Sequence, residues 1–121
     1  MLLADRLNLP FAYIRSKPKA HGKTNLIEGK WEEGMRVLLV EDLVNQGSSL
    51  KAAQVALKSH GGKLVSSFCI VNYEFYKPNE DENFQYLVSF SDLMKFCEES
   101  GKLNSSEIEL TRNWHEELRK K

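Results

Sequence analysis

The sequence is poor in the features that mark secreted, membrane-spanning and nucleic-acid-binding proteins. Its 121 residues include only two cysteines, Cys69 and Cys97, which is too few for a disulfide framework. The longest apolar runs fall well short of the roughly 20 residues that span a bilayer, and no signal-peptide pattern is visible. Seventeen basic and seventeen acidic residues cancel, so neither a nucleic-acid-binding patch nor an acidic tail is indicated.

These absences, together with the composition, favour a cytoplasmic globular protein. Hydrophobic residues make up 41% of the chain and charged residues 28%, which is ordinary for a folded domain. Residues 1–121 have the length of one small domain and show no internal repeat. We expect both cysteines to be buried thiols in a reducing compartment. We expect no metal site built by the protein alone, no membrane partner and no nucleic-acid partner.

The most informative stretch is residues 35–50, which reads MRVLLVEDLVNQGSSL. An apolar run over residues 37–40 predicts a strand that is buried on both faces. Glu41 and Asp42 follow this run, and a small polar loop over residues 45–49 leads into a helical pattern. A strand that ends in acids, a Gly/Ser loop and a helix start is the arrangement of a phosphate site in an α/β sheet.

The residue types in this loop suit a phosphorylated sugar. Backbone N–H groups from Gly47 to Ser49 can point at phosphate oxygens, and the hydroxyls of Ser48 and Ser49 can add hydrogen bonds. Glu41 and Asp42 stand where a ribose diol, or a metal bound to it, could be held. The Gly-Lys-Ser/Thr ending of a P-loop is absent. The plainer alternative, an ordinary buried strand followed by a polar turn, remains open at this point.

The segments after this loop predict a parallel sheet. Apolar residues recur at helical spacing over residues 50–57, with Ser48 or Ser49 as the expected N-cap and Gly61 at the end. Residues 63–71 are rich in apolar and β-branched side chains and predict the next strand. Strand, helix and strand at this spacing form a βαβ unit, whose two strands are parallel.

Shorter elements are expected before the central strand. They are a helix over residues 2–7, a strand over 11–14, a cationic loop over 15–23 and an extended piece over 25–30.

A strand and two helices are expected toward the end of the chain. Residues 85–90 predict the strand, and Ser106 with Glu109 predicts a capping box at the start of the last helix. The buried stripe of that helix should consist of Leu110, Trp114 and Leu118. His60 and His115 are expected at the surface.

The central stretch resembles the phosphoribosyl-pyrophosphate (PRPP) motif of the type I phosphoribosyltransferases, in which an apolar strand leads into two acids and a Thr/Gly/Ser-rich loop. The segment before it is similar to the mobile catalytic loop of the orotate phosphoribosyltransferases, with Arg15, Lys19, His21 and Gly22 in matching order. Residues 71–93 also resemble this family, so the similarity covers nearly the whole chain.

The sequence departs from the family pattern in two ways. Ser16 stands where the family often has a second Lys, and Asn45 and Gln46 replace a Thr-containing pair in the loop. Members of the family are also usually nearly twice as long. Their N-terminal half supplies part of the orotate-binding hood, the first sheet strands and the loop that holds pyrophosphate. The chain therefore resembles the C-terminal half of such an enzyme.

The resemblance implies a fold, a reaction and partners. The fold would be α/β, with a mostly parallel sheet flanked by helices and without the N-terminal hood and first strands. The reaction would transfer ribose 5-phosphate from PRPP to orotate, giving orotidine monophosphate and pyrophosphate, with Mg²⁺ bound alongside PRPP. Because the family's mobile loop reaches into the partner subunit's site, a homodimer is implied as well.

The resemblance also implies roles for single residues. Lys19 is expected nearest to the pyrophosphate and Glu41 and Asp42 at the ribose hydroxyls, which makes these three the catalytic candidates. The substrate-binding candidates are the two acids together with Arg15, Lys17, His21, Asn45, Gln46, Gly47, Ser48 and Ser49. Tyr76 and Lys77 are further candidates for the base side of the cleft.

Two other functional hypotheses fit the same residues. A non-catalytic module that binds PRPP or a nucleotide would carry the same phosphate motif. An inactive truncated chain that needs a separate N-terminal chain would carry it too. From charge alone, the cationic loop could be a solvated segment without function, and the acid pair could simply favour the adjacent helix N-terminus.

Overall fold

The computed structural model describes residues 1–15 and 26–120. Its elements are, in order, α1 (Leu2–Arg6), β1 (Ala12–Ile14), β2 (Ile27–Gly29), β3 (Arg36–Val44), α2 (Ser48–Ser59), β4 (Lys63–Asn72), β5 (Phe84–Ser89), α3 (Phe90–Glu99) and α4 (Ser105–Arg119). The predicted loop residues Lys17, Lys19 and His21 lie outside the described residues. In the described ranges, no helix is both long enough and apolar enough to cross a membrane.

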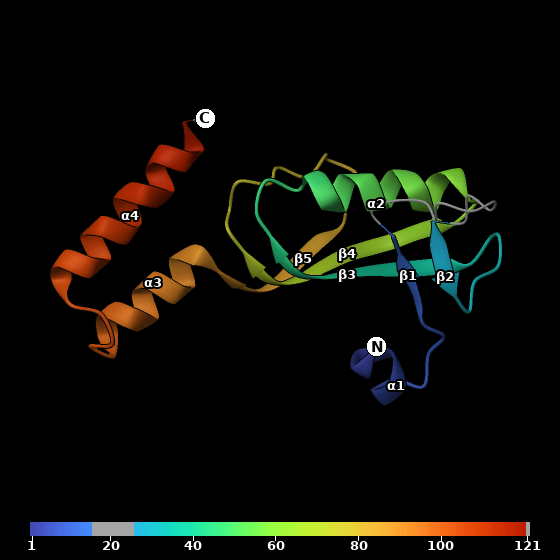
Figure 1. Ribbon diagram of the computed structural model, residues 1–121, viewed down its shortest axis with the longest axis horizontal. Helices are drawn as coiled ribbons and strands as arrows, with labels where there is room; N and C mark the ends of the chain where they lie inside the picture. Colours follow the sequence, from blue (N-terminus) through green and yellow to red (C-terminus); the bar gives the residue numbers. More distant parts are fainter. Residues whose placement is uncertain (16–25, 121) are drawn as a thin grey trace.

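Strands β3, β4 and β5 form a parallel sheet in that order, with Val40 opposite Phe68 and Cys69 opposite Tyr86. Helix α2 connects β3 to β4, which confirms the predicted βαβ unit. Strands β1 and β2 pair antiparallel as a separate ribbon, and Figure 1 shows this ribbon beside the amino end of β3. The predicted α/β class with a parallel sheet and flanking helices is therefore confirmed.

The core lies between the sheet and α2. Leu50 of α2 is fully buried and packs with Val44, Cys69 and Tyr76 in one cluster. Leu57, two turns further along α2, is 1% exposed. The helix ends at the predicted place, because Gly61 adopts the left-handed conformation that follows a helix end, with φ +77°.

The opposite face of the sheet is open, and this corrects the prediction that the central strand is buried on both faces. Leu38 and Val40 are 49% and 47% exposed, and Ile70 and Leu87 on the neighbouring strands are 48% and 71% exposed. Successive side chains of a strand point to opposite faces, so α2 can cover only alternate residues. Figure 1 shows α2 along one side of the strands, while α3 and α4 lie beyond their end.

The helix starts differ from the predicted ones. Gly47, with φ +79°, is the N-cap of α2, and no side chain caps that end, so neither Ser48 nor Ser49 plays the predicted role. The last helix begins two residues earlier than expected, because Asn104 and Glu107 form the capping box in place of Ser106 and Glu109. Asn and Ser are both good caps, and only the backbone path decides between neighbouring candidates.

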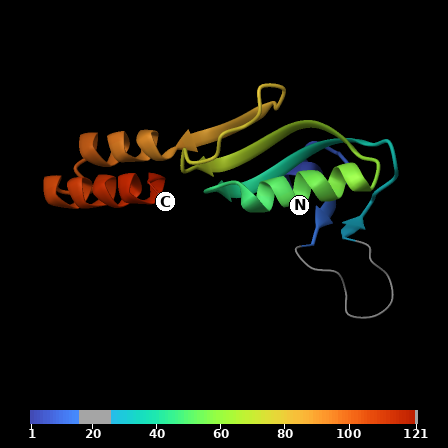
Figure 2. The same ribbon diagram turned by 90° about the horizontal axis from the view of Figure 1, so that it is seen from above.

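Helices α3 and α4 lie side by side beyond the carboxyl end of the sheet (Figure 2). Helix α4 buries Ile108 and His115, whereas Leu110 and Trp114 of the predicted stripe are 71% and 46% exposed. The expected surface position of His115 is wrong: its Nε2 donates a hydrogen bond to the Tyr73 carbonyl at 2.6 Å. The imidazole also stacks on the Phe90 ring, with centroids 3.9 Å apart.

The two cysteines are both free thiols. Cys69 is buried as predicted, but Cys97 is only half-buried. Cys69 belongs to the cluster under α2, whereas Cys97 lies on α3, outside the sheet.

Candidate functional site

The predicted acid pair lies inside β3 and not beyond its end. The strand continues through Glu41 and Asp42 to Val44, so the sequence prediction placed the strand end too early. Because strand side chains alternate, the two carboxylates leave opposite faces of the sheet. Glu41 is half-buried on the side of Cys69, which pairs with it in the register, and Asp42 is exposed.

The two acids differ in their electrostatic surroundings as well. Burial, and after it the negative charge of Asp42, raises the pKa of Glu41 above its ordinary value of 4.5. Glu41 therefore holds a proton more tightly than an exposed glutamate does. Asp42 is the acid that solvent, and therefore a polar substrate, can reach directly from the open side of the strand.

The turn of residues 45–49 follows at the carboxyl end of β3. Asn45, Gln46, Ser48 and Ser49 are exposed, while Gly47 is buried between them. The first N–H groups of a helix have no intrahelical partner, and the macrodipole makes that end positive. The start of α2 has no side-chain cap and no acidic residue in its first turn. An anion can therefore approach both the backbone amides and the two hydroxyls of this turn.

A tyrosine that the sequence analysis placed elsewhere lies behind the turn. Tyr76 is 5% exposed, so it does not line the base side of an open cleft as predicted. A Cβ added to Gly47 would lie 2.6 Å from Cε2 of the Tyr76 ring and would overlap Cδ2. Tyr76 donates a hydrogen bond to the Glu82 carboxylate at 2.6 Å, and the Lys51 ammonium lies 5.5 Å from the ring centroid.

Burial, and after it the hydrogen bond to Glu82, raises the pKa of Tyr76 to about 12. The hydroxyl therefore remains a donor at neutral pH. No sequence signal places this ring on Gly47, because the two positions lie far apart in the chain and only the loop after β4 brings them together. The position of Lys51 near the turn could have been predicted, because Lys51 stands one helical turn after Gly47 in the predicted helix.

The structure does not bring Arg15, the described residue of the predicted cationic loop, to this turn. Arg15 forms an ion pair with Glu28 across the β1–β2 ribbon, with 3.3 Å between Nε and Oε1. That ribbon lies toward the amino end of β3, whereas the turn follows the carboxyl end of the same strand (Figure 1). The remaining loop candidates, Lys17, Lys19 and His21, lie outside the described residues.

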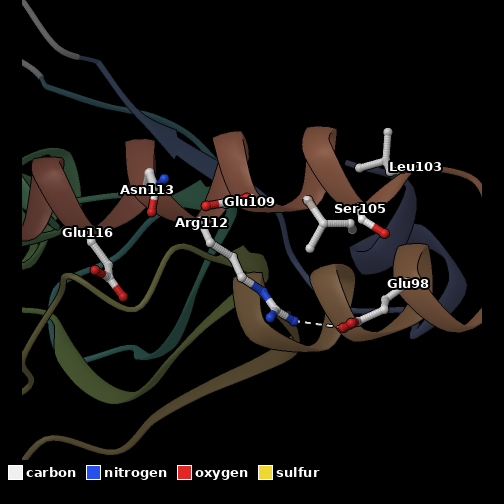
Figure 3. A pocket seen from close by; sticks show the side chains of 8 residues that line it. Glu98, Leu103, Ser105, Glu109, Arg112, Asn113 and Glu116 are labelled. Atoms are coloured by element: carbon white, nitrogen blue, oxygen red, sulfur yellow. Dashed lines mark hydrogen bonds and ion pairs between the residues drawn. The ribbon is translucent and has the colours of Figure 1, made fainter.

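Two cavities lie elsewhere in the described part of the chain. One of about 570 Å³ is formed mainly by the N-terminal segment and β3, and Glu41 reaches its edge. Another of about 370 Å³ lies between α3 and α4, where Arg112 forms an ion pair with Glu98 at 2.8 Å (Figure 3). Residues of the turn line neither of them. The candidate site is a turn whose residues 45, 46, 48 and 49 are exposed.

The carboxylates fit a magnesium ion only if the substrate brings most of its ligands. Across residues 1–15 and 26–120, no three His, Cys, Asp or Glu side chains gather closely enough to hold a metal ion. Mg²⁺ commonly keeps several waters and binds through one or two carboxylates plus substrate phosphates. An exposed Asp42 near the candidate phosphate turn suits a magnesium site in which the substrate supplies most ligands.

Comparisons with known proteins show the family of this chain. The family described as phosphoribosyl transferase domain matches residues 1–98. The chain belongs to the phosphoribosyltransferase family. It is 37% identical over 123 residues to the orotate phosphoribosyltransferase of Lactobacillus johnsonii, which covers 96% of this chain and 57% of that protein. The resemblance predicted from the sequence is confirmed.

Solved structures of phosphoribosyltransferases share the fold. The chain is similar to Mycobacterium tuberculosis orotate phosphoribosyltransferase in complex with PRPP, with a TM-score of 0.56 and 26% identity over 70% of this chain and 50% of that chain. The Leishmania donovani UMP synthase has the same fold over 95% of this chain and 26% of that chain, with a TM-score of 0.77 and 24% identity. The chain spans about half the length of the orotate phosphoribosyltransferases it matches.

Proposed function

We propose that this chain acts in the transfer of ribose 5-phosphate from PRPP to orotate, which gives orotidine monophosphate and pyrophosphate in pyrimidine nucleotide synthesis. The observation that carries the proposal is the exposed turn of residues 45–49. This turn follows Glu41 and Asp42, and it includes the start of α2, which has no side-chain cap. Membership of the phosphoribosyltransferase family and the identity to proteins named orotate phosphoribosyltransferase support it.

In this proposal the turn holds the 5-phosphate of PRPP. Ser48 and Ser49 supply exposed hydroxyls, and the first amides of α2 supply donors at the positive end of the helix. Asn45 and Gln46 contribute backbone groups, because backbone contacts do not depend on the side chains, which differ here from the Thr-containing pair of the family. A phosphate bound here would take the place of the missing side-chain cap.

The reacting end of the sugar would lie toward the acids. Asp42 holds the ribose hydroxyls from the exposed side, and Glu41 adds negative charge from the half-buried side. The transition state of a glycosyl transfer resembles an oxocarbenium ion, so nearby carboxylates stabilise it. Mg²⁺ bound with PRPP would offset the charge of the departing pyrophosphate.

The cationic loop is proposed to act on the pyrophosphate from a second subunit. Arg15 is engaged by Glu28 at the β1–β2 ribbon, and that ribbon lies toward the other end of β3, so Arg15 is not placed for the turn of its own chain. A homodimer in which Arg15, Lys17, Lys19 and His21 serve the partner's site accounts for this separation. Association would also cover exposed apolar residues such as Leu38 and Val40.

The proposed compartment is the cytoplasm. Both cysteines are free thiols, which suits a reducing environment. Detection of the chain by fractionation of its source cells would test this.

The direct test is turnover. The purified chain is incubated with orotate, PRPP and Mg²⁺, and the loss of orotate absorbance is followed against a reaction without PRPP. We expect PRPP-dependent loss of orotate with formation of orotidine monophosphate. Failure of both turnover and PRPP binding, in a folded sample, would refute the proposal.

A lysine in the cationic loop gives the sharpest single-residue test of the chemistry. Lys19→Ala should leave the dissociation constant of PRPP within about twofold and should lower kcat by at least about 100-fold, because its charge acts on the leaving pyrophosphate. Lys30→Ala, outside the loop, is the control and should leave both constants unchanged. A Lys19→Ala chain with the turnover of the unmodified chain would remove Lys19 from the mechanism.

The open sheet face favours a second candidate, a module that binds PRPP without catalysing its reaction. Leu38, Val40, Ile70 and Leu87 are 47–71% exposed among the described residues, so a complete active site could require a further polypeptide. Calorimetry that detects PRPP binding without orotate turnover would support this candidate. Recovery of turnover on addition of a separate N-terminal phosphoribosyltransferase segment would show that the chain is one part of an enzyme.

A further inference from the structure

Tyr76 contacts the candidate phosphate turn from inside the protein. Its ring lies so close to the Cα of Gly47 that a methyl group at this position would overlap ring atom Cδ2. The ring is 5% exposed and packs with Val44 and Leu50, the residues that border the turn on either side. Tyr76 therefore faces the turn from the side opposite to solvent.

The hydroxyl of Tyr76 is fixed by a network that joins three elements. It donates to the Glu82 carboxylate at 2.6 Å, in the connection between β4 and β5. Gln54 of α2 donates to the same carboxylate, and it also donates to the Ser67 hydroxyl of β4 at 3.1 Å. Phe84 packs its ring edge-on against Tyr76, with centroids 5.1 Å apart. The ring therefore has little freedom to move away from Gly47.

The turn itself has few internal supports. Gly47 adopts φ +79°, and no side chain caps the helix that begins there. The amide of Lys51 bonds to the Gly47 carbonyl at 2.8 Å, which closes the first helical turn but leaves the outer side of the turn open. The Lys51 ammonium lies 5.5 Å from the Tyr76 ring centroid, so the ring also borders the nearest positive charge of α2.

We propose that Tyr76 is a positioning residue for phosphate binding, which holds the Gly47 turn in its left-handed conformation by direct contact between its ring and the Gly47 backbone. The hydroxyl anchors the ring through Glu82 and Gln54. Tyr76 touches no substrate in this scheme. The inference rests on the proposed function for one point only: the bound anion is taken to be the 5-phosphate of PRPP.

The contact is tested first without any ligand. Gly47→Ala adds a methyl group where the ring stands, whereas Gly34→Ala adds one at a similar φ, +83°, with no atom within 4 Å. Both variants carry the same backbone strain, so the difference between their unfolding midpoints reports the ring contact. We expect Gly47→Ala to unfold at clearly lower denaturant. In Tyr76→Leu chains this excess loss should shrink.

The positioning role is tested by PRPP affinity in the presence of Mg²⁺. Tyr76→Leu should raise the dissociation constant of PRPP about tenfold, while Tyr76→Phe, which keeps the ring, should stay within about threefold. Leu57→Val, a core substitution two turns along α2, controls for general loss of stability and should leave the affinity unchanged. If the chain turns over orotate, KM for PRPP should rise in Tyr76→Leu while KM for orotate does not.

The outcomes separate this inference from the proposed function. If PRPP and inorganic phosphate both fail to bind the unmodified chain, the proposed function fails. The ring contact is then still tested by the unfolding midpoints of the two alanine variants. It is also tested by NMR spectra, in which the ring should shift the Gly47 α protons upfield. Equal unfolding midpoints for Gly47→Ala and Gly34→Ala, without such shifts, would overturn the contact. Unchanged PRPP affinity in folded Tyr76→Leu would overturn the positioning role.

Discussion

Helices α3 and α4 begin with carboxylates of their own, whereas α2 begins with none. At α3, Asp92 accepts from the Ser89 amide at 2.9 Å and the Ser89 hydroxyl accepts from the Asp92 amide at 3.0 Å. At α4, Asn104 and Glu107 form the same reciprocal pair. At α2, Gly47 is the N-cap, no side chain accepts from the helix amides and the first turn holds no acid.

The difference shows how one short chain uses the same backbone feature in two ways. A capping box satisfies two amides of a helix start and places negative charge at the positive end of the dipole. α3 and α4 obtain both effects from their own side chains and so stabilise the C-terminal part of the fold. α2 lacks both, and in a phosphoribosyltransferase a substrate phosphate can supply them. Under the proposed function, the uncapped start of α2 leaves these amides accessible to the phosphate of PRPP.

The largest effect should come from giving α2 the acid that it lacks. Ser48→Asp places a carboxylate in the first turn, which should stabilise the helix by about 0.3–1 kcal/mol and should weaken PRPP binding more than tenfold by repulsion of the phosphate. Calorimetry and denaturant unfolding on the same sample measure the two effects. A gain in both stability and affinity would contradict the assignment of the phosphate to this turn.

Helix α4 offers a matched control for that substitution. Ser105 is the first residue of α4, as Ser48 is of α2, and both side chains are exposed. Ser105→Asp should change stability by a similarly small amount and leave PRPP affinity unchanged. Equal losses of affinity in the two variants would mean that added charge anywhere on the chain repels PRPP.

The next largest effect should come from removing a cap that the chain supplies itself. Asn104→Ala deletes the acceptor for the Glu107 amide and should lower the free energy of unfolding by about 1 kcal/mol. Ser48→Ala removes no cap and should lower it by much less. Denaturant unfolding of the two variants tests the comparison, which fails if Ser48→Ala costs as much as Asn104→Ala.

A smaller effect is expected at Lys51, the cation beside the α2 start. Lys51→Gln should weaken PRPP binding by about twofold to fivefold, because an exposed charge contributes little through solvent. Raising the salt concentration should reduce the difference between the two proteins. Lys58→Gln, in the last turn of the same helix, should leave the affinity unchanged. Equal effects at both lysines would point to long-range attraction in place of a local contact.

The smallest effect should be the acid sensitivity of the α3 cap. The hydrogen bonds from the Ser89 hydroxyl and backbone lower the pKa of Asp92 below its ordinary value of 3.8. The contribution of this cap to the free energy of unfolding is therefore complete above the ordinary pKa of 3.8, and it is lost as the pH falls through the lowered pKa. Unfolding measured between about pH 2 and 5 should show a steeper acid loss in the unmodified chain than in Asp92→Asn. Parallel curves would mean that Asp92 gives no pH-dependent support to α3.

Local sequence predicted most of the candidate site. The apolar run ending in Glu41 and Asp42, the polar residues 45–49 and the helical spacing after them belong to one continuous stretch, so their order in space follows their order in the chain. A helix long enough to cross back over the sheet makes the two strands of a βαβ unit parallel, and the turn that leads into this helix therefore lies at the carboxyl end of β3. The position of the strand end was less well determined, because acidic residues such as Glu41 and Asp42 are depleted in strands and made the strand look shorter than it is.

Long-range contacts were the part that sequence could not supply. Tyr76 reaches Gly47, and His115 reaches the Tyr73 carbonyl at 2.6 Å, because loops bring distant residues together and leave no periodic trace. The pairing of Arg15 with Glu28 depends in the same way on the β1–β2 register. The exposure of Leu38 and Val40 depends on which helices cover the sheet, and an apolar run has the same composition whether or not a cover is present.

The sequence by itself therefore determined the parallel α/β arrangement and the polar turn between β3 and α2, since both follow from patterns within a few neighbouring segments. Only the tertiary structure decided that one face of the sheet is open in the described residues and that the buried Tyr76 ring lies against Gly47 of the turn. These features depend on packing between segments that are far apart in the chain, and such packing is set by the shape of the whole fold.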